Sequence, residues 1–163
     1  MTEVRRIAPS DVDAVVGLVH DLAAHEKAPD ECHLTPEQLH AALFGPTPSL
    51  YGHVAEVDGA VAGFTLWFLN FSTWRGTHGI YLEDLYVRRE HRGSGLGVAL
   101  LKALAQECVR QGYARLEWSV LRWLTPTIEF YESIGAVPLD EWKTYRLTDE
   151  PLRALARRRP PTP

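Results

Sequence analysis

The order of apolar and polar positions predicts one strand and two helices in the first part of the chain. Residues 4–7 are typical of a short strand. After Ser10, which we expect to cap a helix with Asp13 in a weak capping box, apolar residues recur every three or four positions. A second helix is predicted to begin at 35–38, where a threonine can act as the N-cap and a proline suits the first helical position. The glutamine that follows can reach back to the cap residue with its side chain. Gly45 ends it.

Apolar runs in the middle of the chain predict three strands. Residues 51–57 and 60–71 are separated by an Asp-Gly pair (58–59), a strong hairpin signal because both turn residues accept a positive φ. A loop is expected over 72–79, and a third long strand over 80–87. We therefore predict an antiparallel hairpin, followed by a strand whose middle carries an acidic pair.

A glycine-rich turn at 92–97 leads into a third helix that ends at Gly112. The buried face of this helix is predicted to consist of Leu101, Leu104, Ala105 and Cys108. On that face Cys108 is interpreted as a core residue and not as a reactive thiol.

The remainder of the chain predicts a strand over 115–121, a short helix over 125–135 and a last strand over 142–147. Strands joined through a helix imply a parallel pair, whereas the hairpin implies antiparallel pairs. The pattern therefore indicates an α+β fold, with a mixed central sheet and helices on both faces. One domain is expected over 1–156, with a disordered tail over 157–163 that is rich in Arg and Pro.

The composition adds no new element to this picture, but it excludes a disordered chain and disfavours a nucleic-acid-binding protein. Hydrophobic residues make up 45% and charged residues 23% of the 163 positions, which is the balance of a globular protein. The 17 Lys and Arg residues against 21 Asp and Glu residues give a net charge of −4. A mildly acidic chain is poorly suited to nucleic acid, because attraction to phosphate supplies non-specific affinity.

Metal and membrane sites are not expected either. The two cysteines form no CxxC pair, and the seven histidines form no HExxH motif. The N-terminus has no signal-peptide pattern, and no apolar run approaches the ~20 residues that cross a bilayer. We therefore expect a soluble cytoplasmic protein.

The glycine-rich turn is the first feature that suggests chemistry. Glycines between a strand and a helix N-terminus expose backbone N–H groups at the positive end of the helix dipole, which suits a phosphate group. The GxGxG spacing of 92–97 is neither a P-loop, which needs a following GK[ST], nor the GxGxxG dinucleotide fingerprint. On these residues alone, a turn that only allows close helix–strand packing is the alternative.

Other short motifs accompany this turn. They are Leu-Tyr-Val directly before it (85–87), Ser-Thr-Trp-Arg-Gly (72–76), Ile-Tyr-Leu-Glu-Asp (80–84), His-Glu-Lys (25–27), and Phe-Tyr (130–131) with Gly-Ala (135–136). The glycine loop resembles the acetyl-CoA pyrophosphate loop of the GNAT N-acetyltransferases. The other motifs resemble the diamine (spermidine/spermine) and thialysine acetyltransferase branch of that family. The resemblance spans about 5–156 and implies a GNAT-like fold.

The resemblance implies that acetyl-CoA is the cosubstrate. It would be held by the strand end, the glycine loop and the start of the next helix, namely by Leu85, Tyr86, Val87, Arg92, Gly93, Ser94, Gly95, Leu96, Gly97 and Val98. In one place the chain departs from the branch, which has Asp-Trp-Asn where this sequence has Arg-Trp-Leu (122–124). Leu124 cannot make the polar contact of the missing Asn, and Arg122 either offers a charge to CoA or is solvated.

The implied reaction needs three groups. An alkylammonium with a pKa near ~10.4 must lose a proton before it attacks a thioester. The site therefore needs a proton acceptor, donors for the oxyanion and an acid for the departing sulfur. The resemblance makes Glu83 the base, through a water, with binding of the ammonium alone as the alternative; Asp84 is expected to bind substrate or to be structural. Tyr131 is expected to protonate the thiolate, although its spacing alone favours a core aromatic.

The same resemblance implies that Glu26, Trp74, Glu83 and Asp84 bind a cationic substrate. A solvated loop carboxylate at position 26 and ordinary packing of the tryptophan are the alternatives. The predicted function is direct transfer of acetyl to a small primary amine, either a polyamine or a thialysine-like amino acid. A CoA-binding sensor with little catalysis is the alternative, and acetylation of protein lysines would need an open groove.

A homodimer is also expected. The resemblance suggests it, and the strand over 60–71 carries four large aromatic residues, more apolar surface than one face of a small sheet needs. These residues are Phe64, Trp67, Phe68 and Phe71.

Overall fold

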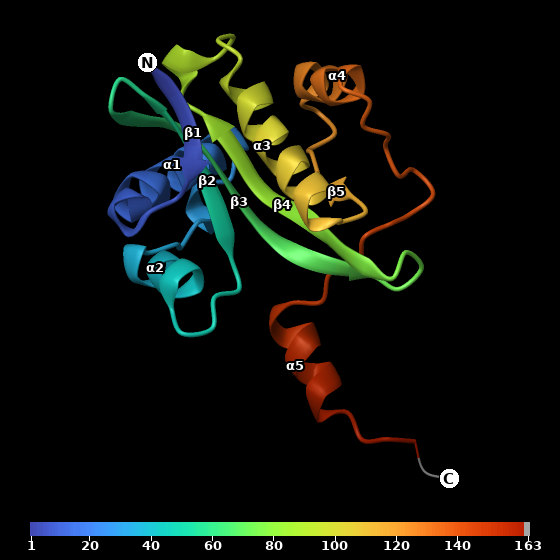
Figure 1. Cartoon of the computed structure of the whole chain (residues 1–163). Coiled ribbons are helices and arrows are strands. Elements are labelled where there is room, and N and C mark those ends of the chain that lie inside the picture. The colour runs from blue at the N-terminus through green and yellow to red at the C-terminus, as the bar shows by residue number, and fades with distance from the viewer. Residues whose placement is uncertain (162–163) are drawn as a thin grey trace. The chain divides into compact units, whose positions relative to one another are not determined.

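The computed structural model describes residues 1–161, and the chain divides into two compact units, Met1–Leu121 and the part from Arg122 onward (Figure 1). The first unit contains the whole sheet and three α-helices. The second contains two α-helices joined by extended chain. The single domain that the sequence predicts over 1–156 stays a prediction.

Five strands form one open sheet in the first unit. The strand order is β1-β2-β3-β4-β5, so each strand lies beside the strand that precedes it in sequence. The first four pair antiparallel, and β5 pairs parallel with β4. The predicted α+β class with a mixed, mostly antiparallel sheet is therefore confirmed. The strands are β1 (Thr2–Arg6), β2 (Tyr51–Val57), β3 (Ala60–Ser72), β4 (Thr77–Val87) and β5 (Leu116–Glu117).

The two hairpins of the sheet differ in how well the sequence predicts them. Asp58 and Gly59 join β2 to β3 with φ values of +50° and +83°, as the Asp-Gly signal requires. The loop predicted over 72–79 is too long, because β3 continues to Ser72 and pairs there with Thr77 of β4. The turn between them is confined to 73–76.

The first helix begins one residue later than the sequence predicts. A short 3₁₀ turn over Pro9–Asp11 precedes α1 (Val12–His25), and Ser10 does not cap it. Asp11 occupies the N-cap position of α1 without a side-chain cap hydrogen bond to that helix; its Oδ2 accepts a hydrogen bond from the Ala8 N–H, before the 3₁₀ turn, at 2.7 Å. The Arg5 guanidinium binds both oxygens of Asp11 and holds the pKa of this buried carboxyl below its usual range.

The second helix, α2 (Pro36–Phe44), confirms its predicted start. Gln38 donates its backbone N–H to the Thr35 hydroxyl at 3.2 Å, and the Thr35 N–H returns to the Gln38 side chain at 3.0 Å. Together with α1, this helix covers one face of the sheet, where Leu18 and Leu39 pack in one core cluster with Phe64 and Leu66 of β3.

The opposite face is covered by α3 (Leu96–Gln111), so the prediction of helices on both faces is confirmed (Figure 1). Leu96 and Leu100 pack there against Ala55 and Ala62. The predicted buried face of α3 is wrong at Ala105, which is exposed.

Glu107 takes that place on the buried face of α3, where it pairs with Arg6, Arg110 and Gln111. A carboxylate is tolerated there because these partners balance its charge.

The second unit contains α4 (Thr125–Ser133) and α5 (Asp149–Arg157). The sequence predicts α4, but it predicts a strand over 142–147 and no helix after it. That strand is wrong, because these residues form no regular element and join no ladder in the described chain. Its large side chains are exposed, among them Trp142 and Tyr145. The predicted strand over 115–121 also shrinks, to Leu116–Glu117.

The helix α5 is stabilised by charges and not by an apolar face. Asp149 and Glu150 lie in its first turn, and Glu150 pairs with Arg153 at 3.2 Å and Arg157 at 2.6 Å. Acidic residues first and basic residues last suit the helix dipole. The tail predicted to be disordered over 157–163 therefore begins inside a helix; 158–161 form no regular element, and residues 162 and 163 lie outside the described residues.

Candidate active site

A β-bulge interrupts the pairing of β3 with β4 at the acidic pair. Asp84 lies opposite Leu66, but the next pair along the ladder is Leu82 opposite Trp67, so Glu83 has no partner residue. Such an extra residue locally changes the alternation of side chains and bends the strand. The two acids are therefore not a regular pair of strand neighbours with side chains on opposite faces of the sheet.

The bulge places Asp84 on the face of the sheet that α1 and α2 cover. Cross-strand partners share a face, and Leu66, the partner of Asp84, belongs to the core cluster of α1 and α2. Leu82 lies on the other face, because its partner Trp67 contacts Arg6, which pairs with Glu107 of α3. Without the extra residue, Leu82 and Asp84 would share one face.

The surroundings of Asp84 raise the pKa of its carboxyl group. Its side chain is half-buried, and burial, followed by the nearby charges of Glu83 and Glu26, raises its pKa to about 7. Within residues 1–161, no hydrogen bond or ion pair to its carboxyl is found. The carboxyl therefore meets two like charges and no cation.

The C-terminal end of α1 faces the same region. The His25 ring lies 6.3 Å from the Tyr86 ring, centroid to centroid, and Tyr86 is two residues beyond Asp84 on β4. Glu26 is the C-cap residue of α1 and follows directly. The structure thus brings together three predicted site residues, Glu26, Glu83 and Asp84.

The glycine loop has the backbone that a phosphate site needs. Gly93 and Gly95 have φ values of +79° and +87°, and the space where a side chain would start is open at both. The first hydrogen bond inside α3 runs from the Ala99 N–H to the Gly95 carbonyl at 3.0 Å. The N–H groups of 96–98 therefore have no partner within the helix, and they lie at the positive end of its dipole.

Arg92 ties this loop to the end of β4. Its Nε donates a hydrogen bond to the Val87 carbonyl at 3.0 Å, and its guanidinium lies 5.2 Å from the centre of the Tyr86 ring. The Ser94 hydroxyl turns back to the His91 carbonyl. Arg92 thus links the predicted cofactor residues of the loop to those at the strand end.

The second half of β4 has an unpaired edge. Pairing with β5 is confined to Ile80 and Tyr81, so no strand of residues 1–161 pairs with that edge of β4 over 82–87. The Arg88 N–H donates to Ala62 of β3 at 2.8 Å. Since backbone groups alternate in direction along a strand, the N–H groups of Leu85 and Val87 point to the open edge.

Two predicted site residues are not part of this arrangement in the first unit. Trp74 lies in the turn between β3 and β4 and is 91% exposed. The rise of about 3.3 Å per strand residue puts Thr77 roughly 23 Å from Asp84, so Trp74 does not meet Asp84 in its own chain. Tyr131 lies in α4 of the second unit, where its ring is 5.6 Å from that of Phe130.

The departure from the branch motif falls at a helix start. Leu124 is the N-cap residue of α4, and it makes no side-chain cap hydrogen bond. Asn is among the best N-cap residues, and its loss typically lowers helix stability by about 1 kcal/mol. The residue that replaces the family Asn therefore weakens the start of the helix that carries Tyr131.

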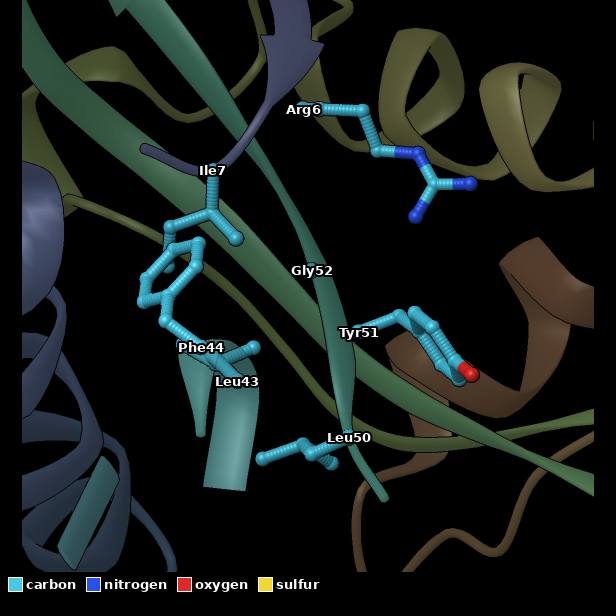
Figure 2. A pocket seen from close by; sticks show the side chains of 7 residues that line it. All are labelled: Arg6, Ile7, Leu43, Phe44, Leu50, Tyr51 and Gly52. Carbon is cyan, nitrogen blue, oxygen red and sulfur yellow. The ribbon is translucent and has the colours of Figure 1, made fainter. Parts of the chain in front are cut away.

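A pocket of about 230 Å³ lies elsewhere, where β1 ends and β2 begins. Figure 2 shows Arg6 and Tyr51 on one side of β2, and Leu43 and Phe44 on the other. None of the predicted site residues lines it. No sequence motif indicates this pocket, because its residues lie in or beside β1, α2 and β2 and come together only in the fold.

Neither a metal site nor a membrane segment is found in the described chain. Over 1–161, no three His, Cys, Asp or Glu side chains are grouped so that they could hold a metal ion. In the same range no helix has both the length and the apolar character to span a membrane.

Comparisons with known proteins agree with the fold and with the family resemblance. The model of the Acetyltransferase (GNAT) family matches residues 18–136. The chain is 34% identical over 164 aligned residues to the thialysine N-epsilon-acetyltransferase of Bos taurus, covering 94% of this chain and 96% of that one. The spermidine/spermine N(1)-acetyltransferase-like protein 1 of Homo sapiens is 29% identical, over 94% of this chain and 24% of its own length.

Among solved structures, an integron cassette protein from the mobile metagenome of V. cholerae is similar, with a TM-score of 0.81 and 25% sequence identity. The match covers 96% of this chain and 98% of that protein.

Proposed function

The chain belongs to the Acetyltransferase (GNAT) family and is an N-acetyltransferase, and we propose that it transfers acetyl from acetyl-CoA to a small primary amine. We propose a polyamine or a thialysine-like amino acid as the substrate class, the two classes that the names of these relatives mention. The single observation that carries this proposal is the group of three carboxylates, Glu26, Glu83 and Asp84, without a cation beside Asp84. Such a group is suited to an ammonium ion, because a buried carboxylate needs a compensating charge.

The glycine loop and the strand end fit the acetyl-CoA that the family uses. We propose that the N–H groups of Leu96, Gly97 and Val98 bind the pyrophosphate, where glycines leave the approach open. Arg92, Gly93, Ser94 and Gly95 complete this loop.

The open edge of β4 (Leu85, Tyr86, Val87) pairs with the pantetheine arm, and its free N–H groups stabilise the oxyanion. Bound acetyl-CoA supplies the activated acetyl group, which this chain cannot supply itself.

The proposed proton-moving residues are a carboxylate of β4 and a tyrosine of α4. One carboxylate of the pair Glu83 and Asp84 takes the proton of the ammonium, and the family resemblance favours Glu83 through a water. Tyr131 gives a proton to the departing sulfur. We place Trp74 with the substrate residues, contributed from a second copy, since in its own chain it lies far from Asp84.

A CoA-binding sensor with little catalysis is the second candidate. The observation that favours it is Leu124, an apolar residue at the N-cap of the helix that carries Tyr131. The retained Glu83, Asp84 and Tyr131 favour an enzyme.

Steady-state release of the CoA thiol separates these proposals. Spermidine, putrescine, thialysine and lysine are each tested as acceptor, with both substrates varied. We expect turnover with at least one amine, and intersecting double-reciprocal plots as direct transfer through a ternary complex requires. Parallel plots would indicate a covalent acyl-enzyme instead. Binding of acetyl-CoA by calorimetry without turnover on any amine would identify a sensor.

We also propose a cytoplasmic homodimer, as the sequence predicts. Of the four aromatic residues of β3 that suggested a subunit contact, Phe64 and Trp67 belong to the core of the chain. Phe71 is 54% exposed and supports the contact.

A further inference from the structure

We infer that Tyr86 is a positioning residue whose ring holds Glu26 beside Asp84 and joins the group of three carboxylates to the loop proposed to bind acetyl-CoA. This inference deepens the proposed function and rests on it. The ring carries this role, because Tyr86 contacts both His25 and Arg92 through its ring.

Tyr86 lies on the same face of β4 as Asp84. Its cross-strand partner is Phe64, and the partner of Asp84 is Leu66. Both partners belong to the core cluster of α1 and α2, and cross-strand partners share a face. The Tyr86 ring is half-buried and packs against this cluster. The ring is therefore fixed on its strand, two residues beyond Asp84.

The end of α1 is held against this ring. The His25 and Tyr86 rings are 6.3 Å apart, centre to centre, with 60° between their planes, which is within the range of favourable aromatic pairs. The helix ends directly after His25. The Glu26 N–H still donates to the Leu22 carbonyl at 2.9 Å, but Lys27 has a φ of +63° and leaves the helix. The contact between His25 and Tyr86 therefore sets where Glu26 lies relative to β4.

The position of Glu26 needs such a contact because its charge repels the acids of β4. This charge is one of the causes that raise the pKa of the Asp84 carboxyl, so the two side chains are near each other. Without a cation between them, their repulsion pushes the end of α1 away from β4. The packing of His25 on the Tyr86 ring opposes this repulsion and keeps the carboxylates together until an ammonium ion binds.

The second neighbour of the Tyr86 ring comes from the glycine loop. The Arg92 guanidinium carbon lies 5.2 Å from the centre of the ring, within reach of a cation–π attraction. Its Nε donates to the Val87 carbonyl at 3.0 Å, and Gly93 follows directly in the chain. A loop ordered by acetyl-CoA therefore also restrains Arg92 and, through the ring, the end of α1. The amine then binds to a site that needs less ordering, so its affinity rises.

Calorimetry measures this link without a reaction. The affinity for the amine is measured with and without saturating CoA, which has no acetyl group to transfer. The amine is whichever of spermidine and thialysine the wild-type enzyme acetylates faster. We expect CoA to raise the affinity of the wild type for this amine by about fivefold or more, the lower end of the usual coupling between two sites.

Two substitutions break the link from opposite sides. Tyr86→Leu removes the ring, and His25→Ala removes its partner at an exposed position, where the fold tolerates the change. Each should lower the affinity for the amine by about two- to tenfold, the contribution of one aromatic pair. Each should also reduce the effect of CoA to about twofold or less. In steady-state assays the KM for the amine should rise at nearly constant kcat, because the ring touches neither reacting atom.

Two further variants test whether the ring and its place matter. Tyr86→Phe keeps the ring and should keep both wild-type values. Tyr51→Leu is the matched control, since Tyr51 stacks on the Trp67 ring at 4.9 Å and lies 5.8 Å from the Arg6 guanidinium. It lines the pocket at the start of β2, apart from the predicted site residues (Figure 2). Its loss should lower the free energy of unfolding as the loss of Tyr86 does, without changing the affinity for the amine or the effect of CoA.

The double variant Tyr86→Leu/His25→Ala completes the test. It should bind the amine no more weakly than either single variant, since both substitutions remove one contact. Additive losses, or a loss in Tyr86→Phe as large as in Tyr86→Leu, would overturn this inference. A wild type that acetylates the amine but whose affinity for it does not respond to CoA would also overturn it and leave the proposed function intact. A wild type that acetylates neither amine would overturn both.

Discussion

At the scale of single residues, the hydroxyl of Tyr131 makes the sharpest prediction. A thiol has a pKa near ~8.5 and leaves more readily than an amine, but the addition step can also reverse by expelling the amine. Protonation of sulfur biases the reaction forward, and such assistance is typically worth about 10²–10⁴ in rate. Tyr131→Phe should therefore lower kcat by this factor, leave KM for acetyl-CoA unchanged and remove the alkaline limb of the pH–rate profile.

Tyr145→Phe is the matched control for this change. Tyr145 is exposed in the same unit, so removal of its hydroxyl should leave kcat unchanged. A Tyr131→Phe enzyme with near-normal kcat would identify Tyr131 as a core aromatic, and the thiolate would then leave unaided.

Asp84 should also make stability depend on pH. Its pKa is about 7 in the folded chain and near ~3.9 in the unfolded chain, so between these values the native state binds more protons. The free energy of unfolding of the wild type should fall as pH rises from 4 to 7, by up to about 4 kcal/mol. Asp84→Asn removes this loss, so the variant should be the more stable protein at pH 8.

Urea unfolding at pH 4.5 and pH 8 measures this effect. We expect the stability difference between Asp84→Asn and the wild type to be small at the lower pH and large at the higher pH. A difference that does not change with pH would show that the Asp84 carboxyl is solvated.

At the scale of elements, the two ends of α3 offer a controlled test of cofactor binding. Gly95 and Gly112 flank the helix with φ values of +87° and +73°, so valine is strained by about 1–2 kcal/mol at either position. Gly95→Val should weaken acetyl-CoA binding tenfold or more, since a charge-assisted hydrogen bond contributes about 1.5–3 kcal/mol. Gly112→Val should destabilise the fold as much as Gly95→Val does, but it should leave the affinity for acetyl-CoA unchanged. Equal affinities of the two variants in calorimetry would make the loop a packing turn only.

Elements that depend on neighbouring residues were predictable from the sequence. The turn at Asp58 and Gly59 and the capping box of Thr35 and Gln38 each need only a few adjacent positions, and both are confirmed. The glycine loop belongs to the same class, because its backbone demands glycine at Gly93 and Gly95.

Elements that depend on distant partners were not predictable. The bulge at Glu83 exists only because β3 and β4 change register between Leu66 and Trp67, and neither strand alone encodes that shift. The segment 142–147 has a strand-like composition, but a strand also needs a partner, and the described chain gives it none. Glu107 was not among the predicted buried residues of α3, because helical periodicity does not reveal that Arg6 of β1 pairs with it.

At the scale of the whole molecule, the proposed dimer is tested by its mass. Light scattering at micromolar concentration should give twice the 18.3 kDa of one chain. Phe71 of β3, an exposed large apolar side chain, supports association. A monomer mass at this concentration would remove the dimer and, with it, a contribution of Trp74 to a neighbouring site.

The identity of strand order and chain order has a consequence for synthesis on the ribosome. Each strand that emerges pairs with the strand made just before it. The turns that join β2 to β3 and β3 to β4 are short, which lowers the entropy that folding must overcome. Two pairings span helices: β1 with β2 spans α1 and α2, and β4 with β5, which is two residues long, spans α3. The nascent chain should therefore bury its apolar strands early, when exposed edges are most prone to aggregate.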